Sequence, residues 1–234
     1  MKSVVIIPAY NESQKIYHVV QSVVNRGYDV VVVDDGSGDN TAHEARRAGA
    51  VVLSHCINRG YGAALTTGNG WAYRNNYDIA VHFDADGQHN PDEIENITAP
   101  IQKREADIVI GSRFIESDAN GANNTRMARM RIPIVRKILI RLATKFTRVV
   151  SGIQLTDAHN GFRALSREAL GKINCMQDGM SYASEVVDQI AEHGWRYKEV
   201  PNTIVYTQYS RQKGESNVKK ILLGVRFLWG KVIK

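Results

Sequence analysis

Two aspartates one residue apart are the feature of the sequence that most clearly suggests chemistry. Asp84 and Asp86 follow an apolar run in the stretch VHFDADGQHNPDE, which spans residues 81–93. In an extended segment, residues i and i+2 project to the same side, so both carboxylates face one way and Gln88 or His89 comes round in the turn. Crowded carboxylates cost free energy unless a cation joins them. Such oxygen ligands suit Mg²⁺ or Mn²⁺, so the stretch predicts a divalent-metal site for a phosphorylated leaving group.

Polar residues also follow the other apolar runs in the first half of the chain. They lie directly after these runs, at residues 8–12, 34–37 and 58–60. In open α/β sheets, ligands bind beyond the carboxyl ends of the strands, so these residues and the aspartate pair are expected at one rim. Helix capping explains Asp39 or Ser37 equally well. It does not explain Asp34, Asp35 and Asp84, which come too early for the helices that follow.

Continuous β-branched runs that alternate with helical segments predict the elements that hold this rim. The runs are SVVIIP, DVVVVD, AVVLSH, DIAVHFD and ADIVIGS, the last of which ends at Ser112. The intervening helices are expected over residues 13–26, 40–49 and 61–74, with a fourth that opens at Pro91. Such alternation is typical of an α/β fold with a mostly parallel, Rossmann-like sheet covered by helices on both faces.

The pattern changes after Ser112. The elements expected there are a polar loop over residues 113–124, a basic helix over 126–150, a short strand in NGFRALS, a helix over 181–193 and one or two strands in RYKEVPNTIVYTQ. A final amphipathic helix completes the chain, and no internal repeat or low-complexity linker divides its 234 residues. We therefore expect one domain, with a nucleotide-binding half over residues 1–112 and an acceptor-binding half over residues 113–234.

Charge and cysteine content limit the class of protein. The net charge is +6, and the excess gathers between Arg126 and Arg148 and in the C-terminal stretch NVKKILLGVRFLWGKVIK. A basic surplus suits anionic lipid or phosphorylated substrates, although a solvated positive face is the commoner meaning of a charge run. Cys56 and Cys175 show no metal-ligand spacing and are expected as free thiols in a reducing compartment. Without a cleavable signal pattern or an apolar run of ~18 residues, a cytoplasmic protein is expected.

The residues at the strand ends disfavour several other classes of protein. A dinucleotide-binding oxidoreductase needs G-x-G-x-x-G after the first strand, where this chain has PAYNES, and no P-loop is present. A phospho-receiver module would explain VVVDDGSGD, but it needs a lysine after the fifth strand, where Gly111, Ser112 and Arg113 stand. A sugar nucleotidyltransferase needs a glycine- and arginine-rich phosphate loop near residue 10, which is missing.

Seven ordered motifs resemble the inverting glycosyltransferases of family two, which have the GT-A fold. The motifs are IPAYNE, VVVDDGSGDNT, NRGYGAA, DADGQHNPDE, GSRF, TDAHNGFRALSRE and SYASEVV, and together they span most of the chain. Within the family, the chain is similar to the dolichyl-phosphate mannose synthase and polyprenyl-phosphate glycosyltransferase branch. The resemblance implies transfer of a sugar from a UDP- or GDP-sugar, with Mg²⁺ or Mn²⁺ as cofactor.

The resemblance also implies roles for single residues. Those that would bind the nucleotide sugar are Pro8, Tyr10, Glu12, Asp34, Asp35, Asn58, Gly60 and Asp84. Those that would hold the metal are Asp84, Asp86 and Gln88. Those that would take part in catalysis are Asp86, Asp157, Glu185 and Arg163.

Three arginines in or near the motifs, Arg113, Arg163 and Arg211, would contact phosphate groups of donor or acceptor. A guanidinium fork suits that work because it binds phosphate bidentately. Surface ion pairing is the alternative, and we favour it for Arg211. For Asp157 and Glu185, helix capping or a salt bridge is the alternative to a catalytic role.

The acceptor decides whether the reaction needs a base. A polyprenyl phosphate, the expected acceptor, has a second pKa near ~6 and arrives as an anion, so it attacks the anomeric carbon directly. A saccharide hydroxyl, the alternative acceptor, needs proton removal worth typically ~10²–10⁴-fold, which would fall to Asp157 or Glu185. From another class, a nucleotide-sugar sensor without catalysis is disfavoured by the intact aspartates.

Two basic amphipathic helices indicate contact with a membrane. The helix expected over residues 126–150 and the final helix each carry an apolar stripe with Lys and Arg residues beside it. A basic amphipathic helix with Trp lies in a membrane interface, and each basic residue near anionic lipid adds on the order of 1 kcal/mol. An apolar stripe that faces the protein core or the partner in a homodimer is the alternative. We expect peripheral contact with the inner face of the cell membrane and no nucleic-acid partner.

Overall fold

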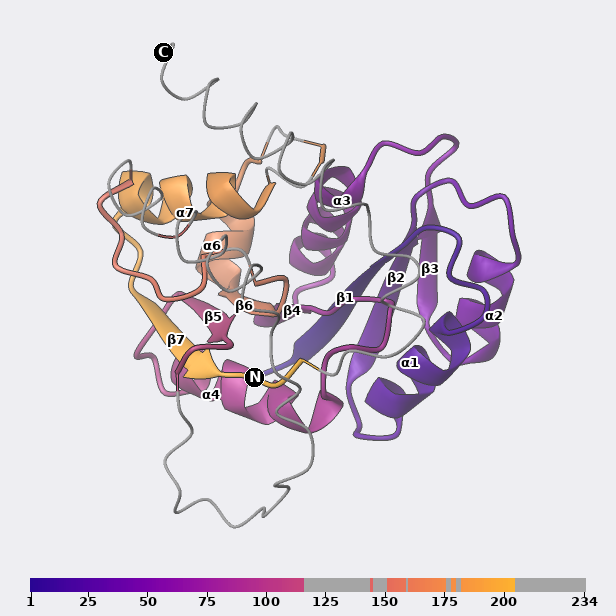
Figure 1. Cartoon of the computed structure of the whole chain (residues 1–234), viewed down its shortest axis with the longest axis horizontal. Coiled ribbons are helices and arrows are strands. Elements are labelled where there is room, and N and C mark those ends of the chain that lie inside the picture. The colour runs from indigo at the N-terminus through magenta and orange to yellow at the C-terminus, as the bar shows by residue number, and fades with distance from the viewer. Residues whose placement is uncertain (116–143, 145–150, 159, 176–177, 180–181, 205–234) are drawn as a thin grey trace.

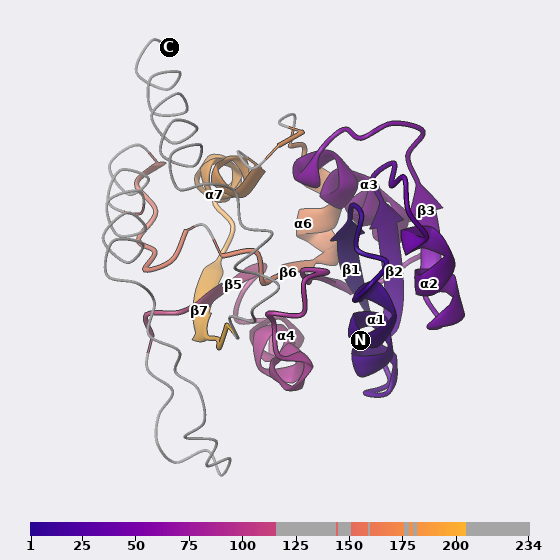
Figure 2. The same cartoon turned by 45° about the vertical axis from the view of Figure 1, so that its right-hand side comes forward.

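The structure, a computed structural model of the chain, describes residues 1–115, 144, 151–158, 160–175, 178–179 and 182–204. The basic helix expected over residues 126–150 lies outside this described part, apart from Thr144, and so does the final amphipathic helix. Helices pack on both faces of a central sheet (Figures 1 and 2). The expected α/β fold with a mostly parallel sheet is therefore confirmed.

Seven strands from the described residues form the sheet. In chain order they are β1 (Ser3–Ala9), β2 (Asp29–Asp34), β3 (Val51–Ser54), β4 (Ile79–His82), β5 (Ile108–Ser112), β6 (Arg163–Ser166) and β7 (Tyr197–Pro201). In space the order is β3-β2-β1-β4-β6-β5-β7. β6 runs antiparallel to both β4 and β5, whereas the other neighbouring strands are parallel. The sheet thus reverses beside β4, the strand that leads to the aspartate pair.

Helices cover the sheet in two groups. In chain order they are α1 (Ile16–Val24), α2 (Thr41–Arg47), α3 (Tyr61–Arg74), the 3₁₀ helix η1 (Pro91–Glu93), α4 (Ile94–Gln102), α6 (Arg167–Lys172) and α7 (Tyr182–His193). α1, α2 and α4 build the apolar core on one face, and α3, α6 and α7 build that on the other. In Figure 1, α3, α6 and α7 lie above the strands, and α1 and α4 lie below them. None of the described helices has the length and apolarity that crossing a bilayer requires.

β1 shows why a continuous apolar run forms a central strand here. Val5 and Ile7 belong to one core and Val4 and Ile6 to the other, because successive side chains of a strand point to opposite faces. All four side chains are 0% exposed. A strand that is covered on both faces needs apolar residues at every position, which SVVIIP supplies.

The second half adds three features that the sequence does not indicate. The strand expected in NGFRALS forms as β6, but it runs antiparallel to its neighbours. The six-residue helix α6 follows it at once, capped by the Ser166 hydroxyl, which accepts the N–H of Ala169 at 3.3 Å. After β7, Ile204 forms an antiparallel bridge with His89. The chain therefore returns from β7 to the turn that follows the aspartate pair.

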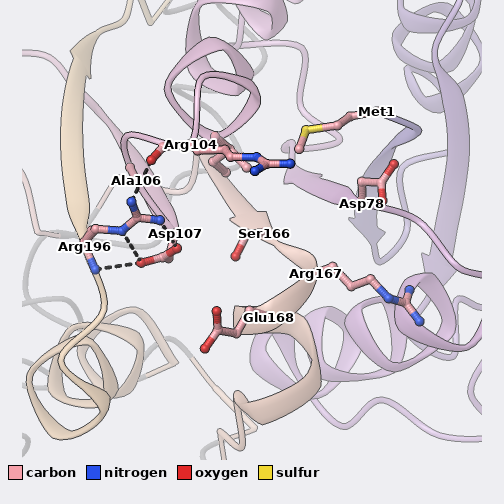
Figure 3. Close-up of a pocket in the computed structure, with 10 residues that line it drawn as sticks. Met1, Asp78, Arg104, Ala106, Asp107, Ser166, Arg167, Glu168 and Arg196 are labelled. Carbon is pink, nitrogen blue, oxygen red and sulfur yellow. Dashed lines mark hydrogen bonds and ion pairs between the residues drawn. The ribbon is translucent and has the colours of Figure 1, made fainter.

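A hollow of about 320 Å³ lies at the amino ends of the parallel strands (Figure 3). Three of the charged side chains that line it, those of Asp107, Glu168 and Arg196, are already paired. Arg196 contacts Asp107 at 2.8 Å and donates to the Arg104 carbonyl at 2.6 Å. Glu168 contacts Lys172 at 2.8 Å. Ligands in open α/β sheets bind at the opposite edge, beyond the carboxyl ends of the strands, so the candidate site is sought there.

Candidate active site

Asp84 lies two residues after β4 and is held by side chains from other elements. Tyr61, the first residue of α3, donates its hydroxyl to Asp84 Oδ1 at 3.0 Å. His89, in the turn before η1, places Nε2 2.9 Å from Asp84 Oδ2. Gly161 lies against the same carboxylate, since a Cβ at this position would be 3.0 Å from Oδ2. The side chain of Asp84 remains 32% exposed and is therefore accessible to a ligand.

Asp86 is held within its own turn. Its Oδ1 accepts the backbone N–H of Gln88 at 2.9 Å, and its Oδ2 accepts the side-chain amide of the same residue. Gly87 between them has a φ of 73°, a conformation that glycine adopts without strain. Lys15 donates its Nζ to the Asp86 carbonyl at 3.1 Å. The turn thus presents the carboxylates of Asp84 and Asp86 and the amide of Gln88 together.

The two carboxylates differ in proton affinity. Burial acts to raise the pKa of Asp84, but the electrostatic influence of His89 and the hydrogen bonds from His89 and Tyr61 outweigh it, so this pKa lies below its usual value. Burial, followed by the charge of Asp84, holds the pKa of Asp86 above its usual value. The repulsion that this difference reflects is relieved when a cation joins the pair.

The donor set fits a hard divalent cation. Carboxylate and amide oxygens are the ligand type that Mg²⁺ and Mn²⁺ prefer, and Mg²⁺ usually keeps water or phosphate oxygens as further ligands. Among the residues that the structure describes, no group of three or more His, Cys, Asp or Glu residues is placed to hold a metal ion. A metal at Asp84 and Asp86 would therefore complete its ligand shell with the Gln88 amide, water or substrate oxygens.

Asp35 joins the loop after β2 to the loop before α3. It is 3% exposed. Its Oδ1 accepts the N–H of Arg59 at 3.0 Å, and its Oδ2 accepts the N–H of Gly60 at 2.6 Å. Tyr61 follows directly, so Asp35 and Asp84 hold consecutive residues of one loop. Asp35 thus shapes the rim, and both of its oxygens are engaged.

The neighbouring residues Asp34 and Asn58 differ in exposure. Asp34, the last residue of β2, is 5% exposed and accepts the N–H of Ser37 at 3.2 Å. Gly36 lies against the loop after β3, since a Cβ there would be 2.7 Å from the Asn58 nitrogen. Asn58 itself is exposed. The loops after β2 and β3 are therefore in contact, with Asn58 accessible on the surface.

The loop after β1 lies beside the loop after β2. The backbone N–H of Asn11 donates to Ser37 Oγ at 2.9 Å. Pro8 and Glu12 are buried, whereas Tyr10 is 46% exposed. Of the three residues expected here to bind the donor, Tyr10 is the one that is exposed to solvent.

Arg113 and Asp157 form a buried ion pair after β5. Arg113 Nε and Nη2 lie 2.6 and 2.7 Å from the two carboxylate oxygens of Asp157, and their side chains are 9% and 0% exposed. Glu199 of β7 accepts the backbone N–H of Asp157 at 2.9 Å. The salt-bridge alternative for Asp157 is therefore the arrangement that the structure has, and two expected site residues neutralise each other.

Arg163, the first residue of β6, is placed differently from the expectation. It is 2% exposed, and burial lowers the pKa of its guanidinium below the usual value. Nε donates to the carbonyl of Asn160 and Nη2 to that of Ala158, each at 2.9 Å. The expected phosphate contact of Arg163 does not fit this placement. The side chain instead ties the loop before β6 to the strand.

Glu185 and Arg211 are the last two expected residues. Glu185 lies in the first turn of α7 and is half-buried. One turn earlier, the Tyr182 hydroxyl accepts the side-chain amide of Asn69 at 2.9 Å, which fixes α7 against α3. Arg211 lies outside the described residues.

Tyr61 and Gly161 contact Asp84, although the sequence does not indicate either contact. Both lie in motifs, NRGYGAA and TDAHNGFRALSRE, but neither is close to Asp84 along the chain. The contacts form only because α3 and the turn before β6 pack beside β4. The sequence signal for these two residues was their place inside the ordered motifs. It did not indicate which residue they would contact.

Comparison with known proteins gives one family. The profile described as Glycosyl transferase family 2 matches residues 4–173. A protein of Methanococcus voltae named UDP-N-acetylglucosamine–dolichyl-phosphate N-acetylglucosaminyltransferase is 31% identical, over 96% of this chain and 92% of that protein. An undecaprenyl-phosphate mannosyltransferase of Micrococcus luteus is 30% identical, over 96% of this chain and 90% of that protein.

The fold has a solved counterpart. The crystal structure of glucosyl-3-phosphoglycerate synthase from Mycobacterium tuberculosis, in complex with Mn²⁺, UDP-glucose and phosphoglyceric acid, matches with a TM-score of 0.71 and 19% identity, over 99% of this chain and 78% of that chain. This likeness confirms the expected GT-A fold. Since the family profile also spans more than half of the sequence, the chain belongs to glycosyl transferase family 2 and is a glycosyltransferase.

Proposed function

We propose that this glycosyltransferase transfers a sugar, with inversion at the anomeric carbon, from a UDP- or GDP-sugar to a polyprenyl phosphate. The observation that carries the proposal is the pair of carboxylates, Asp84 and Asp86, at the carboxyl edge of the sheet. Each is fixed by hydrogen bonds from neighbouring residues. The names of two relatives, which include dolichyl phosphate and undecaprenyl phosphate, support a lipid acceptor.

The donor would be bound by the loops of this edge. Asp84, Asp86 and Gln88 are the residues that would hold a Mg²⁺ or Mn²⁺ ion, and the Mn²⁺ in the structure of similar fold supports a divalent ion. Such an ion neutralises charge that develops on a departing diphosphate. Tyr10 and Asn58 are the exposed loop residues that would contact the base or the ribose. The buried residues of the same loops would hold them in place.

The ion pair of Asp157 supports an acceptor that needs no base. A phosphate oxygen attacks the anomeric carbon while the bond from that carbon to the diphosphate oxygen breaks, and the nucleoside diphosphate leaves. A saccharide hydroxyl would have to lose a proton in the same step. Asp157 is fully buried and bonds both oxygens to Arg113, so it is poorly placed to accept that proton. Of the two carboxylates considered, Glu185 is then the remaining base for a hydroxyl acceptor.

A lipid acceptor places the enzyme at a membrane surface. The basic stretches 126–150 and 218–234 would supply peripheral contact with the inner face of the cell membrane. Each basic residue near anionic lipid contributes about 1 kcal/mol, and salt screens this attraction. The rate of transfer to a lipid in vesicles should therefore depend on vesicle charge.

The direct test is an assay with defined donors and a lipid acceptor. The protein is incubated with Mn²⁺, a panel of UDP- and GDP-sugars, and undecaprenyl phosphate in vesicles with or without anionic lipid. Mass spectrometry of the lipid extract should show a gain of one sugar, with matching release of nucleoside diphosphate and faster transfer on anionic vesicles. The Glu185→Gln variant should retain this turnover, since a phosphate acceptor needs no base.

Three outcomes would contradict the proposal. Transfer to saccharides but not to the lipid, with a loss of about 10²-fold or more in Glu185→Gln, would establish the hydroxyl acceptor. Thermal stabilisation by a nucleotide sugar without any turnover would indicate a sensor. Equal turnover with and without chelation of divalent ions would remove the metal from the mechanism.

A further inference from the structure

We propose that Tyr61 and His89 are positioning residues that orient the Asp84 carboxylate toward the metal. The inference rests on the proposed function, because it assumes that Asp84 is a metal ligand. It goes beyond that function by assigning roles to two residues that need not touch the metal, the donor or the acceptor. The geometry around the carboxylate carries the inference.

The two donors occupy different oxygens of Asp84. The Tyr61 hydroxyl donates to Oδ1 at 3.0 Å, and His89 Nε2 lies 2.9 Å from Oδ2. Each carboxylate oxygen has two lone pairs, so one lone pair on each oxygen remains for a cation. Rotation of the carboxylate about its last bond would break both hydrogen bonds. Asp84 is therefore held in one orientation before a metal arrives.

His89 is fixed by its surroundings. Its side chain is 1% exposed. The ring stacks on Phe162 with centroids 5.2 Å apart and meets the edge of Phe83 at 5.4 Å. Its backbone is fixed as well, by the bridge to Ile204. Among the described residues Nδ1 meets no hydrogen-bond partner, as expected for a ring that donates through Nε2 and keeps a lone pair at Nδ1.

Tyr61 is fixed by the residues on either side of it. The N–H of Gly60 donates to Asp35 Oδ2 at 2.6 Å, and the N–H of Gly62 donates to the Asp178 carbonyl at 2.7 Å. The start of α3 is thus anchored to two other segments. The phenol enters the site from a rigid element, which is the requirement for a residue that orients another.

Gly161 restricts the carboxylate further. A Cβ at this position would lie 3.0 Å from Asp84 Oδ2, 3.1 Å from Oδ1 and 3.1 Å from the Tyr61 hydroxyl. The glycine therefore lets the backbone pass directly against the hydrogen-bonded group. Asp86 is held instead by Gln88 from its own turn, which donates a hydrogen bond to each of its carboxylate oxygens. Asp84 is the preorganised ligand, and Asp86 is the one that adjusts.

The experiment measures Mn²⁺ binding as well as turnover. Mn²⁺ is titrated into the full-length protein, alone and with UDP or GDP, and free Mn²⁺ is followed by electron paramagnetic resonance. Loss of a group that orients a metal ligand typically costs about 10- to 100-fold in metal affinity. We expect Tyr61→Phe to weaken Mn²⁺ binding about tenfold and His89→Phe by at least as much. His89→Gln, which keeps an N–H donor, should recover part of the loss.

Matched controls separate orientation from general damage. Tyr73→Phe removes a hydroxyl from the other end of α3, and His43→Phe changes an exposed histidine of α2. Both should leave Mn²⁺ affinity unchanged. Excess Mn²⁺ should restore turnover in Tyr61→Phe, because the lost orientation affects binding of the metal rather than the later transfer.

The Asp84→Ala variant separates the two hypotheses. If it binds Mn²⁺ as tightly as the original protein, the metal assignment of the proposed function is wrong, and the inference falls with it. If Asp84→Ala weakens binding but Tyr61→Phe and His89→Phe do not, the inference alone is overturned. A lower melting temperature in His89→Phe with unchanged Mn²⁺ affinity would likewise show a purely structural role. Weaker binding in both variants, with both controls unaffected, supports the inference.

Discussion

Two parts of the sheet edge hold their carboxylates with different kinds of partner. We call them the DxD rim, formed by the loops after β1, β2, β3 and β4, and the Arg113 rim, formed by residues 112–115, 155–158 and 160–163. At the DxD rim, Asp35 accepts backbone N–H groups and Asp84 is bonded by Tyr61 and His89. At the Arg113 rim, Asp157 is matched by the guanidinium of Arg113.

The difference indicates which rim is ready for a charged ligand. Backbone N–H groups, a phenol and histidine rings orient these carboxylates without the permanent positive charge of a guanidinium, so the DxD rim stays receptive to a divalent cation. A bidentate guanidinium cancels the charge of its partner, so the Arg113 rim is closed as it stands. The first rim is arranged for binding, and the second holds a loop together.

The Asp157→Asn variant should cause the largest loss in the free energy of unfolding among the variants that test this comparison. It removes the carboxylate that Arg113 contacts through Nε and Nη2, in a site where the arginine side chain is 9% exposed. Removal of one member of a buried pair typically costs about 3–5 kcal/mol in the free energy of unfolding. Chemical denaturation followed by circular dichroism measures the loss.

Asp178→Asn is the matched control for the pair at Asp157. It also removes an arginine–carboxylate contact, 3.3 Å to Arg59, but these side chains are 49% and 53% exposed. An exposed pair contributes about 0–1 kcal/mol, so this variant should be nearly neutral. Equal losses in the two variants would mean that burial does not distinguish the Arg113 pair, and the contrast between the rims would be wrong.

At the DxD rim, a glycine rather than an ion pair controls the packing of the loops. Gly36 has a φ of 72°, and a Cβ there would lie 2.6 Å from the Ile57 carbonyl carbon. A left-handed conformation at a non-glycine residue costs about 1–3 kcal/mol, and the backbone clash adds to it. Gly36→Ala should therefore destabilise the protein by at least that amount in the same denaturation assay.

Gly38→Ala tests whether the effect belongs to that one position. Gly38 lies two residues further along the same loop, and a Cβ there meets nothing within 4 Å. Its replacement should change the free energy of unfolding little. A loss of similar size at both glycines would point to a general sensitivity of the loop, and not to the contact between Gly36 and Ile57.

The DxD rim was largely predictable because its residues follow from local rules. The runs expected as strands end where β1, β2 and β4 end or within a few residues of it, and the helix expected over 61–74 matches α3. A polar residue directly after a buried strand must lie at the carboxyl edge of the sheet. That rule placed Asp35, Asp84 and Asp86 at one rim without any knowledge of their partners.

The Arg113 rim was less predictable because its contacts join residues far apart in the chain. Arg113 meets Asp157 across 44 positions, and Asn160 meets Asn202 across 42. The antiparallel direction of β6 also depends on its neighbours, because the apolar pattern of a four-residue strand does not indicate whether it pairs in parallel or antiparallel. Long-range pairing decided these features.

The smallest expected effect is a difference between the two cysteines in their rate of labelling by a thiol reagent. Cys56 is exposed in the loop after β3, and Cys175 is buried after α6. Burial, followed by the charge of Glu185, raises the pKa of Cys175 to about 12 despite the opposing effect of Arg163. At pH 8 its thiolate fraction is then about 10⁻⁴, and the thiolate is the species that reacts. A thiol reagent should modify Cys56 in the native protein and both cysteines after unfolding.

The raised pKa of Cys175 also predicts that the free energy of unfolding falls in alkaline solution. The folded-state pKa of Cys175 lies above the unfolded value near 9.0, so its contribution to stability is complete below pH 9 and is lost as the pH rises toward 12. The Cys175→Ser variant should lose less stability over this range than the original protein, measured against its own value at pH 8. Rapid native labelling of Cys175 at pH 8 would show that the packing behind the Arg113 rim opens readily, and the rim would then be no more closed than the DxD rim.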